Sequence, residues 1–162
     1  MKSIPSHPNV SLFPSRLTIS AAAPAQASAE TWVRRLLVIA AAWNLIGGAS
    51  ALLDPAKQFA QLFTASLDLT DPLALFFYRC TWINVMAWGV GYLLAAFLPA
   101  ARLPVLAAGG TGKLFYFAAC YGTFAQGAAK PALLAAGVVD VAFAALFLWL
   151  LIALRPGRVM SP

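Results

Sequence analysis

Four apolar segments, each long enough to cross a lipid bilayer, constrain this chain more than any other feature of its sequence. They run approximately over residues 32–53, 73–98, 103–126 and 132–154. At 1.5 Å per residue, a helix of about 20 residues crosses a hydrocarbon core of about 30 Å. Because 62% of the residues are hydrophobic and only 10% are charged, the bilayer is the expected solvent. The sequence therefore predicts an all-α membrane protein.

The apolar segments define one domain with a tail at each end. Because the last three segments are joined by connections too short to hold another domain, we expect a four-transmembrane antiparallel helix bundle over residues 31–155. Residues 1–30 are rich in Ser, Pro and Ala and contain no acidic residue before Glu30, which favours a disordered cytoplasmic tail. A cleaved signal peptide ending near "AQASAE", an organelle transit sequence and a misassigned start codon are the alternatives. We expect residues 156–162 to form a short cytoplasmic tail.

The charged residues outside the apolar centres predict an orientation. One side of the four-span arrangement carries Lys2, Arg16, Arg34, Arg35, Arg102, Arg155 and Arg158. The other side carries Lys57 and Lys130 together with Asp54, Asp68 and Asp71. Cytoplasmic flanks are enriched in Lys and Arg, so we expect both termini in the cytoplasm and the 54–72 loop outside. Because the basic residues gather on one side, the net charge of +6 indicates anionic lipid, and not nucleic acid, as the electrostatic partner.

A short amphipathic helix is expected on the external surface over residues 55–67. Asp54 and Pro55 form a typical helix start, with the Asp as N-cap and the Pro at the first helical position. Apolar residues then follow at near-helical spacing, at Phe59, Leu62, Phe63 and Leu67. This helix either plugs the outer end of the bundle or forms a lid over an external opening.

Two opposite charges lie near the middle of the last two apolar segments, Lys113 and Asp140. A charge at the bilayer centre costs at least ~3 kcal/mol, so we expect both side chains to face inward and to pair. Asn44, Arg79 and Asn84 complete the candidate polar centre, with Arg79 also directed inward.

Two interpretations of this polar centre are open. A structural network would fix helix rotation and register. The expected centre contains two cations, Arg79 and Lys113, but one anion, Asp140, so one positive charge lacks a partner. If the centre is a ligand site, the ligand supplies the missing negative or polar group. A carboxylate, a quinone oxygen, a lipid headgroup or an ion would then compensate that charge.

The two cysteines form a further candidate site. Cys80 and Cys120 are expected at comparable depths, and a redox pair requires their Cα atoms to lie within roughly 7 Å. The alternative is that both are small buried apolar residues. The only histidine, His7, lies in the tail, so we expect no metal site and no His-ligated haem.

Five parts of the sequence together resemble a known group of proteins. They are "WNLIGGASALLDPAKQFAQLF", Arg79, "GVGYLLAAFLPAAR", "GKLFYF" and "VVDVAFAALFLWLL". In order and spacing they resemble small bacterial four-helix membrane proteins that are distantly similar to the DoxX-like superfamily, over roughly residues 32–154. Some DoxX-related proteins are membrane subunits associated with sulfur or thiol oxidation and quinone reduction. The resemblance therefore implies residence in the bacterial inner membrane and a link to quinone or to a redox assembly.

Three functions are consistent with these features. The first is a noncatalytic subunit or small-ligand-binding bundle, in a membrane protein complex or a homo-oligomer. The second is a small transporter or proton-coupled permease, with Asn44, Arg79, Lys113 and Asp140 along its path. The third is a membrane thiol or quinone oxidoreductase using the cysteines. Because no motif identifies catalytic residues, the sequence favours a protein that is not an enzyme.

Overall fold

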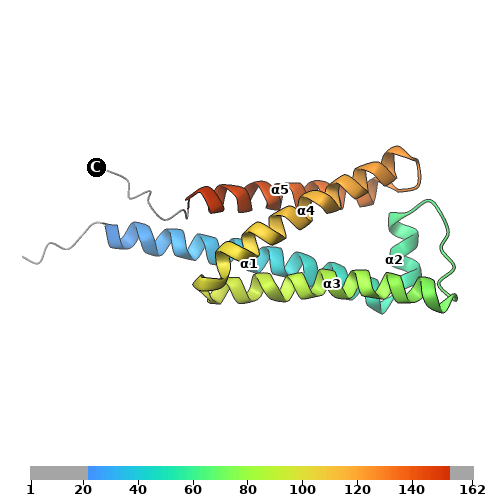
Figure 1. Ribbon diagram of the computed structural model, residues 1–162, viewed down its shortest axis with the longest axis horizontal. Helices are drawn as coiled ribbons and strands as arrows, with labels where there is room; N and C mark the ends of the chain where they lie inside the picture. The colour runs from blue at the N-terminus through green and yellow to red at the C-terminus, as the bar shows by residue number, and fades with distance from the viewer. Residues whose placement is uncertain (1–21, 154–162) are drawn as a thin grey trace, which may run out of the picture.

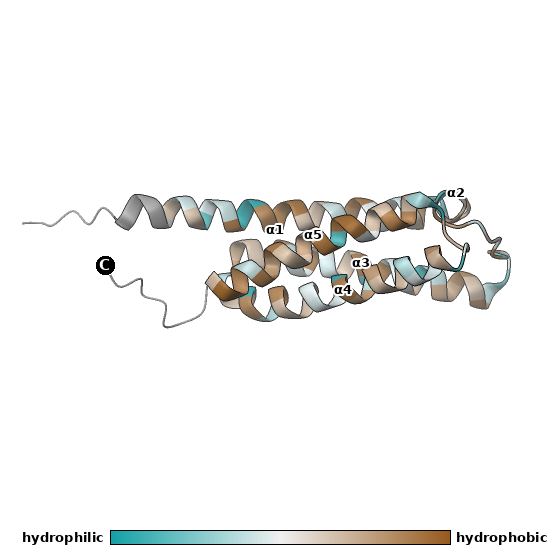
Figure 2. Cartoon of the chain, turned by 90° about the horizontal axis from the view of Figure 1, so that it is seen from above, coloured by the Kyte–Doolittle hydropathy of each residue, from teal (hydrophilic) through white to brown (hydrophobic). Residues whose placement is uncertain are grey.

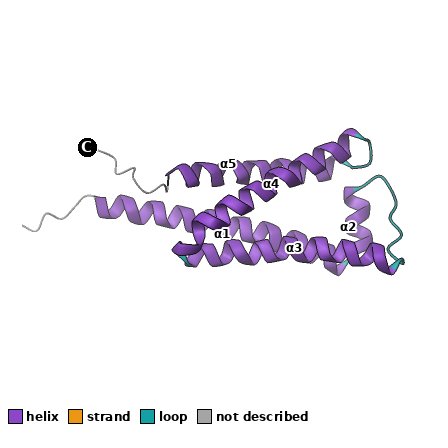
Figure 3. Cartoon of the chain, viewed as in Figure 1, coloured by secondary structure: helices purple, strands orange, loops and turns teal. Residues whose placement is uncertain are grey.

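The computed structural model describes residues 22–153, which form five α-helices (Figure 3). They are α1 (Ala22–Leu53), α2 (Pro55–Leu62), α3 (Pro72–Phe97), α4 (Arg102–Ala125) and α5 (Pro131–Ala153), with a 3-10 turn, η1 (Pro99–Ala101), before α4. Within these residues there is no β-strand, apart from an isolated bridge between Phe63 and Ala129. The predicted all-α class is confirmed.

Four of these helical segments are long and apolar enough to cross a membrane. They are Ala27–Leu53, Pro72–Phe97, Pro99–Ala125 and Pro131–Ala153, close to the four predicted segments. Apolar residues cover much of the long helices in Figure 2, and large apolar side chains such as Ile46 and Phe115 are 68% and 72% exposed. So large an exposed apolar surface needs an apolar surrounding.

The helix starts follow from local capping. The Asp54 carboxylate accepts a hydrogen bond from the Lys57 N–H at 3.1 Å, and Pro55 opens α2. In the same way Asp71 accepts from the Leu73 N–H at 2.9 Å, and Pro72 opens α3. Both starts were predicted.

The end of α2 and the start of α1 differ from the expectation. The second helix ends at Leu62 and not near residue 67, because the following residues pair with the α4–α5 connection. Helix α1 already begins at Ala22, so residues 22–30 are not the disordered tail that we expected. The remaining residues assigned to tails, 1–21 and 156–162, lie outside the described residues, as do His7 and the basic residues Lys2, Arg16, Arg155 and Arg158.

The long helices pack in two pairs, α1 against α3 and α4 against α5 (Figure 1). The start of α1 and the end of α5 lie at one end of the molecule, and α2 runs across the opposite end (Figure 1). At the first end, Trp32 of α1 meets Trp149 of α5 edge to face, with ring centroids 5.2 Å apart. An apolar core there joins all four long helices through Leu37, Tyr92, Leu106 and Phe147, among others.

Candidate functional site

A cavity of about 710 Å³ lies among the helices, and residues of all five α-helices line it. Small-molecule sites usually have volumes of roughly 300–1,000 Å³. The polar side chains along its wall are Asn44, Gln58, Thr81, Asn84, Lys113 and Asp140. The aromatic side chains are Trp43, Trp82, Trp88, Tyr92 and Tyr116. The cavity has the composition of a ligand site, in which a largely apolar wall carries a few polar groups.

The predicted ion pair forms at the wall of this cavity. Lys113 Nζ of α4 donates a hydrogen bond to Asp140 Oδ1 of α5 at 2.5 Å. The side chains are only 5% and 11% exposed, respectively. Each charge compensates the other, which is the condition under which charged side chains are tolerated in an apolar interior. The prediction that Lys113 and Asp140 face inward and pair is confirmed.

Asn44 connects this ion pair to the other pair of helices. Its side-chain oxygen accepts a hydrogen bond from Lys113 Nζ at 3.1 Å, and its side-chain nitrogen donates to the Val85 carbonyl at 3.2 Å. A carbonyl oxygen has two lone pairs, so Val85 can accept this bond in addition to its helical one. The network thus runs from α3 through α1 and α4 to α5.

Two aromatic rings lie close to the ammonium group of Lys113. Its Nζ lies 5.6 Å from the centroid of the Tyr92 ring and 5.2 Å from that of Phe143, both within the range of a cation–π contact. A Cβ atom at Gly109 would lie 2.5 Å from the Tyr92 hydroxyl oxygen, so the glycine makes room for this ring. Tyr92 and Phe143 are parts of the site that the sequence analysis missed. The glycines just before Lys113 were the available signal.

Two glycines leave the cavity wall open. A Cβ atom at Gly47 of α1 or at Gly112 of α4 would meet nothing within 4 Å, and both residues line the cavity. Gly48, in contrast, packs against α3, because a Cβ there would lie only 2.4 Å from Met86 Cγ. One glycine of the Gly47-Gly48 pair thus shapes the cavity and the other permits close helix contact.

Among the described residues, Arg79 and Asn84 form no hydrogen bond with the ion pair. Asn84 lines the cavity, whereas Arg79 is exposed and does not line it, which contradicts the expectation that it points inward. The reason is helical geometry: Tyr78, Trp82 and Val85 follow at spacings of four and three and face the interior, so the residue after Tyr78 is rotated away from them. The network around Asp140 therefore holds one cation and not two.

The structure does not join the two cysteines. Both are free thiols, Cys80 exposed on α3 and Cys120 buried on α4. Cys120 packs against α5, since a Cβ atom at Gly137 would lie 3.1 Å from the Cys120 Cβ. The redox pair that we considered from the sequence is not formed in this structure.

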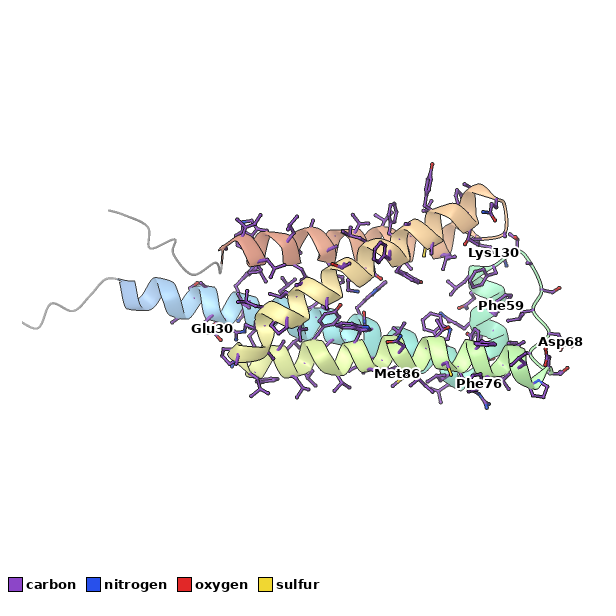
Figure 4. The ribbon with its side chains drawn as sticks, in the orientation of Figure 1. Glu30, Phe59, Asp68, Phe76, Met86 and Lys130 are labelled. Atoms are coloured by element: carbon purple, nitrogen blue, oxygen red, sulfur yellow. The ribbon has the colours of Figure 1, made fainter. Side chains whose placement is uncertain are left out.

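A second ion pair, between the buried Arg102 of α4 and the exposed Glu30 of α1, was missed in the sequence. Arg102, expected at the membrane surface, has a side chain only 7% exposed and binds both oxygens of Glu30 at 2.7 and 2.5 Å. Its guanidinium also donates to the carbonyls of Ala95 and Ala96, at 3.1 and 3.4 Å, near the end of α3. This contact satisfies carbonyls that have no partner inside their own helix. Figure 4 shows Glu30 at the end of the molecule opposite to Lys130 and Asp68.

Helix α2 is tied over the cavity by the α4–α5 connection. The Lys130 N–H donates to the Leu62 carbonyl at 2.8 Å, and Lys130 Nζ donates to the Ala60 carbonyl at 2.5 Å. The Thr64 hydroxyl donates to the Gly127 carbonyl at 2.7 Å. Because Gln58 and Leu62 line the cavity, these contacts hold one of its walls in place.

The loop that follows α2 is ordered by its own side chains. Asp68 Oδ1 accepts hydrogen bonds from the Thr70 N–H at 2.9 Å and from the Thr70 hydroxyl at 2.6 Å. The Thr70 bonds hold the pKa of the Asp68 carboxyl below its usual value. This loop is part of the polar end of the molecule that includes α2.

Comparison with known proteins does not assign this chain to a family. No protein-family model matches the sequence, and no curated protein or solved structure is significantly similar to it. Residues 22–153 contain no group of three or more His, Cys, Asp or Glu side chains arranged to hold a metal ion. The function must therefore be inferred from the cavity and its network.

Proposed function

We propose that this protein is a noncatalytic membrane protein that binds a small ligand in the cavity beside Lys113 and Asp140. The observation that carries the proposal is the position of the ion pair. A purely structural network would be enclosed by close packing, whereas this one borders a continuous volume of about 710 Å³. The exposed fraction of Asp140 gives a ligand access to the carboxylate.

The proposal includes a membrane arrangement. The four long helices form an antiparallel transmembrane bundle in the bacterial inner membrane, and α2 lies on its external surface. Arg34, Arg35 and Arg102 then fall on the cytoplasmic side, as the enrichment of basic residues predicts. The lipid bilayer is the main partner of the exposed apolar side chains.

The resemblance to DoxX-like proteins gives the proposal a biological direction. It suggests that the bundle works with a quinone or within a redox assembly, as one subunit of a membrane complex or as a homo-oligomer. The cavity is compatible with this direction, since an aromatic wall with a few hydrogen-bonding groups suits a flat ring compound with polar substituents.

Copurification tests the proposal. The protein would be purified in mild detergent, and its bound small molecules, lipids and proteins identified by mass spectrometry. The variant Gly112→Leu should lose the bound molecule, because the new side chain enters the cavity. The control Gly122→Leu lies on the same helix, also has open space at its Cβ and does not line the cavity, so it should keep the molecule. A wild-type protein that carries no ligand or partner, or equal retention by both variants, would contradict the proposal.

Transport is the second candidate, because the cavity is bordered by an exchangeable proton donor and acceptor. The apolar core at the other end weighs against it: Leu37, Leu106 and Phe147 are each 0% exposed and block any path in that direction. Flux across proteoliposomes, measured over a panel of ions and organic anions with insertion verified, would favour transport over binding. Its absence across the panel would eliminate this candidate.

A further inference from the structure

We infer that the ligand of this cavity is a neutral aromatic molecule that carries a hydroxyl group, of the phenol or naphthol type. The inference rests on the proposed binding function and specifies the chemistry of its ligand. Three properties of the cavity carry it: the balance of charge, the aromatic wall and the unused hydrogen-bonding capacity of the ion pair.

The balance of charge selects a neutral ligand. Among residues 22–153, Lys113 and Asp140 are the only Lys, Arg, Asp or Glu side chains along the cavity, and they already neutralise each other at 2.5 Å. Arg79, which would have added a second cation, does not line it. An ionic ligand would bring an uncompensated charge into an apolar interior, where its desolvation costs several kcal/mol. The carboxylate considered from the sequence is therefore a poor ligand for this site.

The wall selects an aromatic ligand. Trp43 and Trp88 line the cavity together with Trp82, Tyr92 and Tyr116. Aromatic faces and edges interact favourably with other aromatic rings beyond the simple burial of area. The open wall at Gly47 and Gly112 leaves space beside these rings, because no side chain fills it. A flat ring can occupy this space more fully than a flexible aliphatic chain.

The ion pair selects a group that both donates and accepts a hydrogen bond. Lys113 has three N–H groups, and the described residues offer its Nζ two oxygen acceptors, on Asp140 and Asn44. Asp140 uses only Oδ1 for a hydrogen bond among these residues, although a carboxylate can accept several. A hydroxyl group can donate to Asp140 and accept from Lys113 at once. A quinone carbonyl only accepts, so it can serve Lys113 but not Asp140.

Four related probes test this inference on the full chain in detergent micelles. They are 2-naphthol, the anion 2-naphthoate, 1,4-naphthoquinone and the nonaromatic alcohol 2-decalol. Binding would be measured by equilibrium dialysis at neutral pH, with protein-free micelles as the blank. We expect 2-naphthol to bind at least tenfold more tightly than each of the other three.

Two variants locate the binding. Gly112→Leu, which fills the cavity, should weaken 2-naphthol binding at least tenfold, and the control Gly122→Leu should leave it unchanged. The double substitution Lys113→Met with Asp140→Leu removes both hydrogen-bonding partners of the hydroxyl group and should therefore abolish the preference for 2-naphthol over 1,4-naphthoquinone. Retained circular dichroism and gel-filtration profiles would establish that each variant is folded.

The outcomes separate this inference from the proposal on which it rests. Equal or tighter binding of 2-naphthoate, 1,4-naphthoquinone or 2-decalol would overturn the ligand class but leave a binding site at the cavity. The same affinity in Gly112→Leu as in wild type would overturn the assignment of the ligand to this cavity. Failure of all four probes, while an endogenous molecule copurifies, would overturn the inference alone. Failure of the probes without any copurified molecule would overturn both.

Discussion

At the scale of single residues, the Lys113–Asp140 pair is the feature that the sequence specified best. Two opposite charges in long apolar segments require partners, and in the structure Lys113 and Asp140 pair with each other. Arg79 was assigned wrongly because the helical period places it beside the inward face and not on it. Tyr92 and Phe143 were missed because an aromatic residue in an apolar segment carries no sign of which side chain it will meet.

The ion pair makes a prediction about stability. Lys113→Met and Asp140→Leu should each destabilise the protein by roughly 3–5 kcal/mol, because each leaves a buried charge without its partner. The double variant should recover most of this loss. Thermal and denaturant unfolding in detergent would measure the coupling, with Lys57→Met, at an exposed lysine, as the control. Losses that simply add would show that the two residues are not coupled.

Adjacent glycines on α4 make a second prediction. A Cβ at Gly109 would lie 2.5 Å from the Tyr92 hydroxyl oxygen, whereas a Cβ at Gly110 would meet its nearest neighbour, Phe147 Cβ, at an ordinary 3.6 Å. Gly109→Ala should therefore destabilise by about 1–3 kcal/mol through overpacking. Gly110→Ala should be neutral or stabilising by up to about 1 kcal/mol, because alanine favours the helix. A comparison of unfolding midpoints tests this, and equal effects would contradict the close packing of Tyr92.

At the scale of helices, the sequence predicted the long segments and their starts better than their contacts. The long apolar runs set the helix lengths, and Asp54-Pro55 and Asp71-Pro72 set two starts through local hydrogen bonds. The contact between Glu30 and Arg102 joins residues 72 positions apart and depends on how α1 and α4 are placed. No local sequence pattern encodes the relative placement of α1 and α4. The first turns of α1, residues 22–30, were therefore predicted to be a disordered tail.

The Glu30–Arg102 contact should control the order at the start of α1. Glu30→Gln removes the charge that pairs with the buried guanidinium, at a local cost of about 1–2 kcal/mol. Hydrogen–deuterium exchange of amides around residues 27–34 should then rise about tenfold, while exchange in α5 stays unchanged. Arg35→Gln, an exposed position on the same helix, should have no such effect. Unchanged protection in Glu30→Gln would mean that α1 is held by its apolar contacts alone.

The contacts of Lys130 should control the order of α2. Lys130→Met removes the bond from Nζ to the Ala60 carbonyl but keeps the backbone bond to Leu62. We expect exchange of the α2 amides to rise several-fold without a change in α4, because only one connection to the α4–α5 turn is lost. Lys57→Met is the matched control on α2 itself. Global loss of protection, in place of this local effect, would show that α2 does not move independently.

At the scale of the whole molecule, the orientation of the proposed bundle can be measured directly. In a background of Cys80→Ser and Cys120→Ala, single cysteines would be placed at Ser66, in the loop after α2, and at Ser28, near the start of α1. A membrane-impermeant maleimide should label Ser66→Cys in intact cells, and Ser28→Cys only after lysis, because basic flanks face the cytoplasm. The reverse pattern would invert the arrangement.

The cavity itself could not be predicted from the sequence. The expected class and the four long helices follow from composition and from the length of the apolar segments, but a cavity depends on how the helices tilt and on where side chains are missing. Gly47 and Gly48 look alike in the sequence, and only one of them faces the open volume. The distinction between a packed network and a ligand site therefore required the structure.

The positions of the tryptophans give the molecule its own optical reporter. Three of the five, Trp43, Trp82 and Trp88, line the cavity, whereas Trp32 and Trp149 pack on each other at the opposite end from α2. Fluorescence from the first group should respond to any molecule that enters, and fluorescence from the second pair should remain a constant internal reference. Occupancy can thus be followed in the unlabelled protein, and replacement of the Trp32–Trp149 pair by phenylalanine would raise the fractional signal.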